Sequence, residues 1–200
     1  MAIRLITPPA AEPISLEEAK AHLRVDHDTD DALISMLIGA ARQDCEEWTA
    51  RAFVTQTWEL VVDAFPTNEI LIPRPPLQSI TSIKYDDGDG FEQTLSSTEY
   101  VVDDVSQPGW VVPVTTGWPS SIFEGINAVR IRYVAGYATS GNSPDNLADN
   151  VPGPIKAAIM LRLGQLYEHR EDVIAGTTAV ALPNGAEFLL RQYRVALGMA

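Results

Sequence analysis

The sequence predicts an α+β protein in which N-terminal and C-terminal helices form a bundle and an antiparallel β-rich subdomain is inserted between them. Two observations predict this class. Apolar residues recur every three or four positions over residues 30–51 and again after residue 154, as on the buried side of a helix. Between these regions the apolar period is two, and prolines and glycines separate short runs rich in β-forming residues.

The predicted organisation has three segments. We expect N-terminal helices of the bundle over residues 1–56, a β-rich insertion with a long loop over 57–150, and C-terminal helices with a tail over 151–200. The chain has 200 residues, of which 46% are hydrophobic and 20% are charged. A chain of this length and composition can bury a substantial core, which excludes a disordered protein.

The first helix is predicted from a capping box. Ser15 can accept a hydrogen bond from the backbone of Glu18, whose side chain can return one, and a short helix to about Arg24 follows. Acidic residues then precede a second, longer helix from Asp30 to about Arg51. Its predicted buried stripe consists of Ile34, Ile38, Ala41, Cys45, Trp48 and Ala52, with Leu33, Leu37 and Ala40 beside it.

Six or seven short strands are predicted in the insertion, which favours an antiparallel sheet or a small sandwich. The loop Asp86–Gly90 contains two glycines and joins two of these strands as a hairpin. The predicted strands span residues 57–63, 70–72, 80–85, 91–95, 100–103, 110–114 and 128–134. Residues 136–153 are rich in Gly, Ser, Asn, Asp and Pro and are predicted to be a long loop.

Helical periodicity returns at Pro154, a residue that suits the first turn of a helix. Residues 173–183 are apolar and uncharged, and a last helix is predicted over 186–197. The predicted buried stripe of the helix after Pro154 consists of Ile155, Ala158, Ile159, Leu163, Leu166 and Tyr167. The last helix combines aromatic and basic residues, which are enriched in protein-binding surfaces. The aromatic side chains either pack within the domain or insert into a partner protein.

The charge and the cysteine content exclude several functional classes. The formal net charge of −13 disfavours broad binding to nucleic acid or to anionic membranes. The three segments carry −5, −9 and +1, so only the C-terminal segment would not be repelled by an acidic partner. The lone Cys45 excludes a disulfide scaffold, and no apolar run approaches the roughly 20 residues of a membrane span. The opening residues do not resemble a secretion signal, and we expect the protein to be made in a reducing cytoplasm.

Catalytic and metal-binding patterns give little support for an enzyme, and no cofactor is expected. His22, His27 and His169 lie among carboxylates but lack a metal-ligand spacing, so they are interpreted as surface residues. Cys45 lies on an apolar stripe and is interpreted as a core residue. The acidic loop Asp86–Glu92 departs from the EF-hand pattern and is interpreted as a turn instead of a calcium site.

Several short motifs, in order along nearly the whole chain, resemble phage head–tail connector proteins, the portal adaptors of long-tailed phages and of gene transfer agents. They begin with Pro13–Lys20 and end with Tyr193–Arg194. Those between are Leu23–Asp26, Asp30–Ile34, Ala40–Arg42, Arg51–Ala52 with Trp58, Pro76–Ile80, Tyr133–Tyr137, Val151–Pro152 and Tyr167–Glu171. The shorter members of the family are almost wholly helical, so the β-rich insertion is a departure from its pattern.

The resemblance implies a non-catalytic virion structural protein that forms a ring, commonly of twelve copies, in the neck of a virion or phage-like particle assembled in the bacterial cytoplasm. The expected partners are further copies of the chain, the portal protein, and a stopper or tail-side neck protein. DNA would pass through the ring without specific binding, and no membrane is involved.

Two sets of residues are candidates for these contacts. The predicted portal-binding residues are Phe188, Leu189, Arg191, Tyr193 and Arg194. Because an acidic lumen repels phosphates, some acidic residues are predicted to face the channel. These are Asp26, Asp28, Asp30, Asp31, Glu46 and Glu47.

Three other functions stay open at this point. Another ring-forming neck or tail component, such as a stopper or a tail terminator, would be mainly β-structured. A hydrolase that uses the acidic clusters would need converging carboxylates in a deep pocket. A module that binds a small ligand through the β-rich insertion has no specific support in the sequence.

Overall fold

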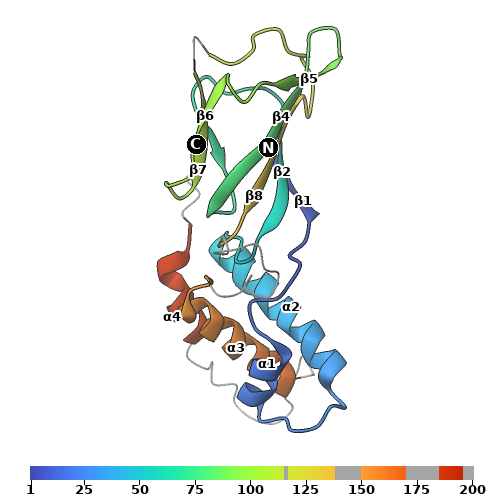
Figure 1. Ribbon diagram of the computed structural model, residues 1–200, viewed down its shortest axis with the longest axis vertical. Helices are drawn as coiled ribbons and strands as arrows, with labels where there is room; N and C mark the ends of the chain where they lie inside the picture. The colour runs from blue at the N-terminus through green and yellow to red at the C-terminus, as the bar shows by residue number, and fades with distance from the viewer. Residues whose placement is uncertain (115–116, 138–149, 170–184, 196–200) are drawn as a thin grey trace, which may run out of the picture. The chain divides into compact units, whose positions relative to one another are not determined.

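The computed structural model describes residues 1–114, 117–137, 150–169 and 185–195, and this part of the chain contains four α-helices and two antiparallel β-sheets (Figure 1). The predicted α+β class is therefore confirmed. The chain divides into two compact units. Residues 1–10 and 54–138 form what we call the β unit, and residues 11–53 and 139–200 form the helical unit.

The helical unit contains two helices before the β-rich segment and two after it. Helix α1 spans Leu16–Leu23, α2 spans Asp31–Thr49, α3 spans Gly153–Glu168 and α4 spans Gly185–Leu190. A 3-10 turn, η2, follows at Arg191–Tyr193. Helices α1 and α2 each pack against α3, and α3 also packs against α4.

Helix α1 begins at the predicted capping box. The Glu18 N–H donates to the Ser15 hydroxyl at 3.1 Å, and the Ser15 N–H donates to a Glu18 carboxylate oxygen at 2.8 Å. Helix α2 is capped at its C-terminal end by Ala50, whose backbone is left-handed with φ 55°. Its N–H donates to the Glu47 carbonyl, and the Arg51 N–H donates to that of Glu46.

The core of the helical unit follows the predicted stripes closely. Most stripe positions on α2 and α3 are buried, and Ile14 and Ala19 complete the core from the N-terminal side. The buried residues of α2 and α3 that were predicted are Ile34, Ile38, Ala41, Cys45, Ile155, Ala158, Ile159 and Leu163. Leu166 was also predicted to be buried, but it is 39% exposed.

The C-terminal helix is shorter than the predicted 186–197. Regular α-helix ends at Leu190, and Arg194 is extended with ψ 125°. The Val195 N–H donates to the Thr49 carbonyl at 2.9 Å, a group that α2 leaves unpaired at its end. Pairing with this carbonyl holds the chain in an extended course, whereas a continued helix would bond within itself. The apolar stretch 173–183 and most of the predicted loop 136–153 lie outside the described residues.

The β unit contains eight strands in the described residues. They are β1 (Ala2–Thr7), β2 (Gln56–Val62), β3 (Ile70–Ile72), β4 (Leu77–Asp86), β5 (Glu92–Leu95), β6 (Tyr100–Asp103), β7 (Gly109–Pro113) and β8 (Val129–Ala135). One sheet has the order β1-β2-β8-β4-β5, and the other has the order β3-β7-β6. All neighbouring strands are antiparallel.

The two sheets bury one face each, as period-two alternation requires. The buried residues of the larger sheet include Leu60, Ile83, Ile131 and Tyr133, and those of the smaller sheet include Ile70, Ile72 and Val111. Gly109 lies so close to Leu77 that a Cβ there would come within 2.8 Å of its side chain. The predicted antiparallel strands therefore form a small two-sheet structure.

Strand β1 is an element that the sequence analysis did not predict. Ala2–Thr7 pairs with β2, with Arg4 opposite Glu59 and Leu5 opposite Trp58. Its residues are all exposed, and the strand lies at the edge of the five-stranded sheet. Residues 1–10 thus belong to the β unit and not to the N-terminal helices. None of the described helices is long and apolar enough to span a membrane.

Candidate docking surface

The end of α2, helix α4 and the segment after it form a surface of the helical unit that combines aromatic and basic side chains, which we call the docking surface. Trp48 lies half-buried on the last turn of α2. The guanidinium of Arg194 lies over its indole ring, 5.2 Å from the ring centroid. A guanidinium at this distance attracts the face of an aromatic ring. Both side chains are therefore positioned by each other.

Two hydrogen bonds attach the C-terminal segment to the end of α2. The Arg51 Nε–H donates to the Tyr193 carbonyl, and the Val195 N–H donates to the Thr49 carbonyl at 2.9 Å. Thr49 in turn donates its hydroxyl hydrogen to the Cys45 carbonyl at 2.8 Å. The bond from Val195 satisfies a carbonyl group that the end of α2 leaves unpaired. The segment is consequently held in a defined position on the helical unit.

Helix α4 presents one face to the core and the other outward. Ala186 and Leu190 are buried, whereas Phe188 is 79% exposed. Arg162 of α3 attaches the helix from the side, because its guanidinium lies 3.4 Å from Glu187 and 3.0 Å from Asp44 of α2. Phe188 is therefore exposed on a helix whose position is fixed by its buried face and by Arg162.

An open hollow of about 540 Å³ lies between these elements. Trp48, Phe188, Glu187, Arg191 and Arg194 line it. The two arginines outnumber the single carboxylate, which is already paired with Arg162. Aromatic and arginine side chains around a hollow are typical of the energetically important part of a protein interface. The hollow therefore suits an acidic partner segment that carries an apolar side chain.

Most of the predicted portal-binding residues line or border this surface. Phe188, Arg191 and Arg194 are exposed, whereas Leu189 and Tyr193 are half-buried. Trp48 and Arg51 belong to the same surface, but the sequence analysis assigned Trp48 to the core stripe and gave Arg51 no role. Their signal in the sequence was weak, because only the return of the chain to the end of α2 brings them beside Arg194 and Tyr193.

The six acidic residues predicted to face a channel do not form one cluster. Asp26 and Asp28 lie exposed in the loop before α2, whereas Glu47 lies exposed near its other end. At 1.5 Å per residue, the helix separates these two positions by roughly 25 Å. Glu46 is buried and does not fit the prediction, because its carboxylate pairs with Arg42 and accepts the Phe53 N–H at 2.7 Å.

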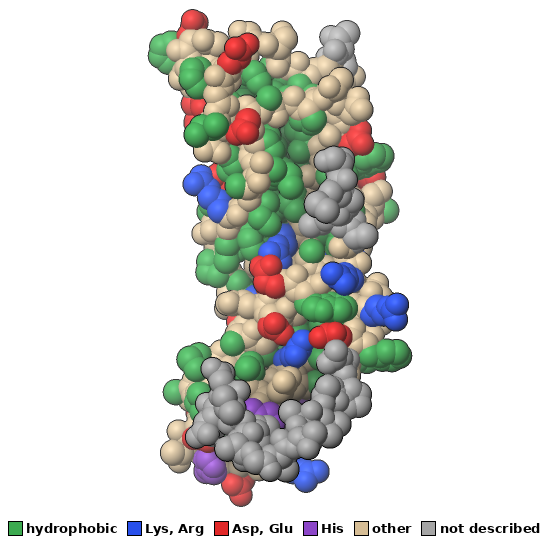
Figure 2. All heavy atoms as spheres, turned by 180° about the vertical axis from the view of Figure 1, so that it is seen from behind, with side chains coloured by type: hydrophobic (Ala, Val, Ile, Leu, Met, Phe, Trp, Pro, Cys, Tyr) green, Lys and Arg blue, Asp and Glu red, His purple; other side chains and the backbone are tan. Residues whose placement is uncertain are grey.

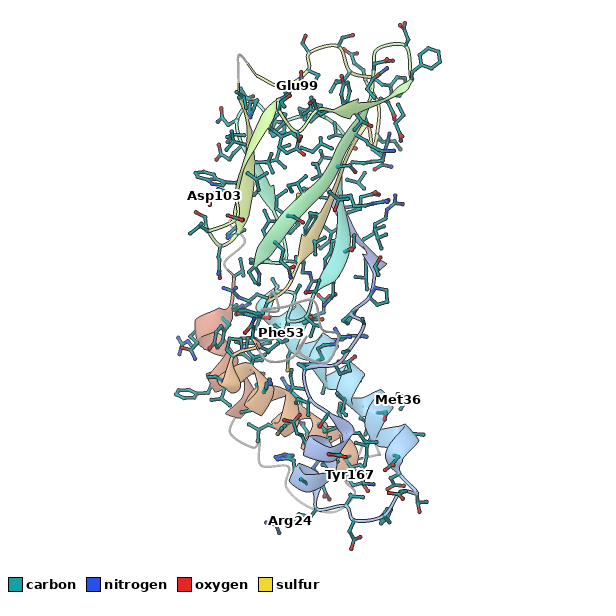
Figure 3. All side chains as sticks on the ribbon, viewed as in Figure 1. Arg24, Met36, Phe53, Glu99, Asp103 and Tyr167 are labelled. Atoms are coloured by element: carbon teal, nitrogen blue, oxygen red, sulfur yellow. The ribbon has the colours of Figure 1, made fainter. Side chains whose placement is uncertain are left out.

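Three of the acidic residues have partners inside the helical unit. The Lys20 ammonium lies 2.7 Å from Asp28 and 2.8 Å from Asp31, and the hydrogen bond from Lys20 lowers the pKa of Asp28 below its ordinary value. The Tyr167 hydroxyl donates to Asp30 at 2.6 Å (Figure 3). These contacts join the loop before α2 to α1 and α3, so part of this acidic charge is used for structure.

The histidines and Cys45 have the exposure and burial that were predicted from the sequence. His22, His27 and His169 are exposed, and Cys45 is buried, where desolvation raises its pKa to about 12. Asp87 accepts the N–H groups of Asp89 and Phe91 at the tip of the β4–β5 hairpin. The carboxylate of Asp87 is thus used by the turn, and the described residues contain no group of three or more potential metal ligands.

Residues 13–107 match the family model described as "Phage gp6-like head-tail connector protein". This match confirms, over that region, the resemblance seen in the sequence motifs. The matched region includes the capping box, α1, α2 and the five strands β2 to β6. A search of curated proteins gave no significant match.

Comparison with solved structures shows a fold shared over nearly the whole chain. Two similar chains come from structures described as "Neck of empty GTA particle computed with C6 symmetry" and "Virion of native gene transfer agent (GTA) particle". Each has a TM-score of 0.79 and 22% identity, with 99% of this chain and 98% of the other covered. A third, "Neck of native GTA particle computed with C12 symmetry", has a TM-score of 0.72 and 21% identity with the same coverage. At this identity the likeness shows the fold.

Proposed function

We propose that this chain is a structural head–tail connector in the neck of a phage-like particle, where copies form a ring that joins the portal to the next neck or tail protein. The observation that carries the proposal is the connector-family match over residues 13–107, together with a fold shared with neck chains over 99% of the sequence. The four helices of the described part fit a connector better than a mainly β-structured stopper or tail terminator.

In this proposal the docking surface binds the portal. Phe188, Arg191 and Arg194 supply exposed contacts, and Leu189 and Tyr193 lie beside them. We add Trp48 to this set because it lines the same hollow. The anchoring by Arg51 and Arg162 supports the assignment, because an interface residue on a fixed backbone loses less conformational entropy on binding.

We further propose that DNA passes through the ring without being bound. The net charge of −13 supports this part of the proposal, because a binding channel would need clustered cations. The exposed carboxylates Asp26, Asp28 and Glu47 are the channel-facing candidates that the structure leaves accessible. Glu46 is withdrawn from the set because it is buried. Assembly would take place in the bacterial cytoplasm, and the role is structural, not catalytic.

The experiment that tests the proposal removes the chain from the producing cells and inspects the particles by electron microscopy. We expect DNA-containing capsids that lack attached tails, and we expect wild-type chain supplied in trans to restore them. Antibody labelling of wild-type particles should place the chain at the neck. Normally tailed particles in the absence of the chain would contradict the proposal.

A further inference from the structure

The two outer faces of the β unit differ in chemistry. The first, which we call the basic face, is the outer face of the five-stranded sheet. Four of the five Lys and Arg residues of the β unit lie on it, and the fifth, Arg74, is buried. The four are Arg4, Lys84, Arg130 and Arg132, which the strand registers place on one side of the sheet together with Glu59, Asp86 and Glu92.

The basic face has a surplus of exposed positive charge at its centre. Arg4 and Arg132 both pair with the single carboxylate of Glu59. The Glu59 side chain is only 5% exposed, whereas those of Arg4 and Arg132 are 60% and 42% exposed. A partner that approaches this face would therefore contact two guanidinium groups and almost none of the carboxylate between them.

The opposite outer face, which we call the apolar face, belongs to the sheet β3-β7-β6. Its exposed positions are large and apolar, in contrast to the polar alternation usual on a solvated sheet face. They are Leu71, Val101, Trp110, Val112 and Val114, between 36% and 54% exposed. Leu71 pairs with Trp110 and Val101 with Val112 in the register, so these side chains form one continuous patch. Hydrophobic side chains are also exposed over much of the β unit on the side that Figure 2 shows.

The charges on the apolar face are acidic. Asp103 lies opposite Trp110 in the register, and Glu99 flanks Val114 (Figure 3). The Trp110 indole N–H and the Ser106 hydroxyl donate to Asp103, and hydrogen bonding to Ser106 lowers the pKa of Asp103 to about 2. Its carboxylate is therefore ionised at neutral pH. None of the described residues of these three strands is basic.

We propose that the apolar face of one copy of this chain packs against the basic face of the next copy, and that this is the contact between subunits of the ring. The proposal rests on the proposed connector function. A ring needs two different, complementary surfaces on each subunit. The outer faces of two packed sheets point in opposite directions, so neighbouring copies can continue the contact around the ring. Burial of the apolar patch supplies affinity, and the opposed charges set the pairing.

The test uses two variants that reverse the charge of one face without breaking an existing ion pair. Leu71→Lys with Val101→Lys places cations on the apolar face. Ser79→Glu with Ser82→Glu places carboxylates on the basic face, where both serines lie beside strand β8. Phe91→Lys is the control, because this residue is 68% exposed in the β4–β5 hairpin and lies on neither face. Circular dichroism of the purified variants checks that each one folds.

Each variant replaces the wild-type chain in the producing cells, and its copies per purified particle are counted by quantitative mass spectrometry. We expect the number of copies per particle to be at least tenfold lower than wild type for each double variant alone. For the control, this number should stay at the wild-type level. Co-expression of the two double variants should restore incorporation, because each retains the face that the other has lost and the reversed faces attract.

Three outcomes would overturn the inference. In the first, both double variants are incorporated as well as wild type. In the second, the apolar-face variant is incorporated fully but the tails are lost, which would assign that face to a tail-side protein. In the third, both double variants fold, but their co-expression does not restore incorporation into particles. By contrast, absence of the wild-type chain itself from particle necks would overturn the proposed function, so the two failures are distinguishable.

Discussion

At the scale of single residues, the buried Glu46 is the clearest case of an acidic side chain whose role is structural. Its carboxylate pairs with Arg42 on the same helix and accepts the N–H of Phe53, just after α2 ends. Arg42 also contacts Glu12 at 2.7 Å, which joins the segment before α1 to α2. The Arg42–Glu46 pair therefore joins α2 to the segment before α1, through Glu12, and to the chain that follows α2, through Phe53.

Replacing Glu46 by Gln is expected to destabilise the helical unit by about 3 kcal/mol, because removing one partner leaves a buried charge with incomplete compensation. Chemical denaturation followed by far-UV circular dichroism measures the change in the free energy of unfolding. Gln43→Ala on an exposed position of the same helix is the matched control and should change this free energy by less than about 0.5 kcal/mol. An equally small effect of Glu46→Gln would refute the structural role.

Cys45 gives a second prediction at this scale. Its thiol is fully buried, and desolvation raises its pKa to about 12, so at neutral pH almost no thiolate is available for reaction. We expect a thiol reagent to modify the native protein at least a hundredfold more slowly than the denatured protein. The rate of absorbance change with a disulfide reagent measures this. Fast labelling of the native protein would show that α2 and α3 do not enclose the thiol.

At the scale of elements, local sequence patterns predicted where helices begin and end and where strands lie. The capping box of Ser15 and Glu18 begins α1 at the predicted residue, and the apolar stripe of α2 gives its bounds to within two residues. Strand positions also followed from alternation and from turn residues such as those of Asp86–Gly90. These features depend on residues that are close together in the chain.

Elements that depend on distant partners were predicted less well. Strand β1 exists because β2, more than fifty residues later, offers it hydrogen-bonding groups. The last helix stops at Leu190 because the following segment bonds to the end of α2. The docking surface shares this origin, since Trp48 and Arg194 are 146 positions apart and meet only in the folded unit. Sequence spacing carries no information on such contacts.

Substitutions on the two faces of helix α4 should affect stability and binding separately, because one face is buried and the other is exposed. Leu190→Ala removes a side chain that is 1% exposed, and we expect it to cost about 2–4 kcal/mol of stability. Phe188→Ala removes a side chain that is 79% exposed, and we expect unchanged stability but portal binding weakened by about 1–3 kcal/mol. Denaturation curves and co-sedimentation with purified portal rings measure the two effects. Undiminished portal binding by Phe188→Ala would exclude this residue from the interface.

At the scale of the whole molecule, the acidic balance is the property that bears on DNA. With a formal net charge of −13, the free chain should show no measurable affinity for duplex DNA at physiological ionic strength, about 0.15 M. Fluorescence anisotropy of a labelled duplex tests this, and lowering the salt should not reveal binding. Tight binding at physiological salt would contradict the proposed passage of DNA.

The channel-facing candidates can be tested in the assembled particle. Asp26→Lys with Asp28→Lys changes two exposed carboxylates into cations on every copy of the proposed ring, and cations that face the lumen would hold the phosphates of passing DNA. Because Asp28 also pairs with Lys20, circular dichroism first checks that the variant folds like the wild-type chain. We expect these particles to contain normal amounts of DNA but to release it several-fold more slowly, with the delay disappearing at high salt because exposed charges are then screened. Asp89→Lys with Glu124→Lys makes the same change of charge at exposed positions of the β unit and should leave the rate unchanged. Release kinetics measured with a DNA-binding dye compare the two, and equal rates at low salt would place Asp26 and Asp28 away from the channel.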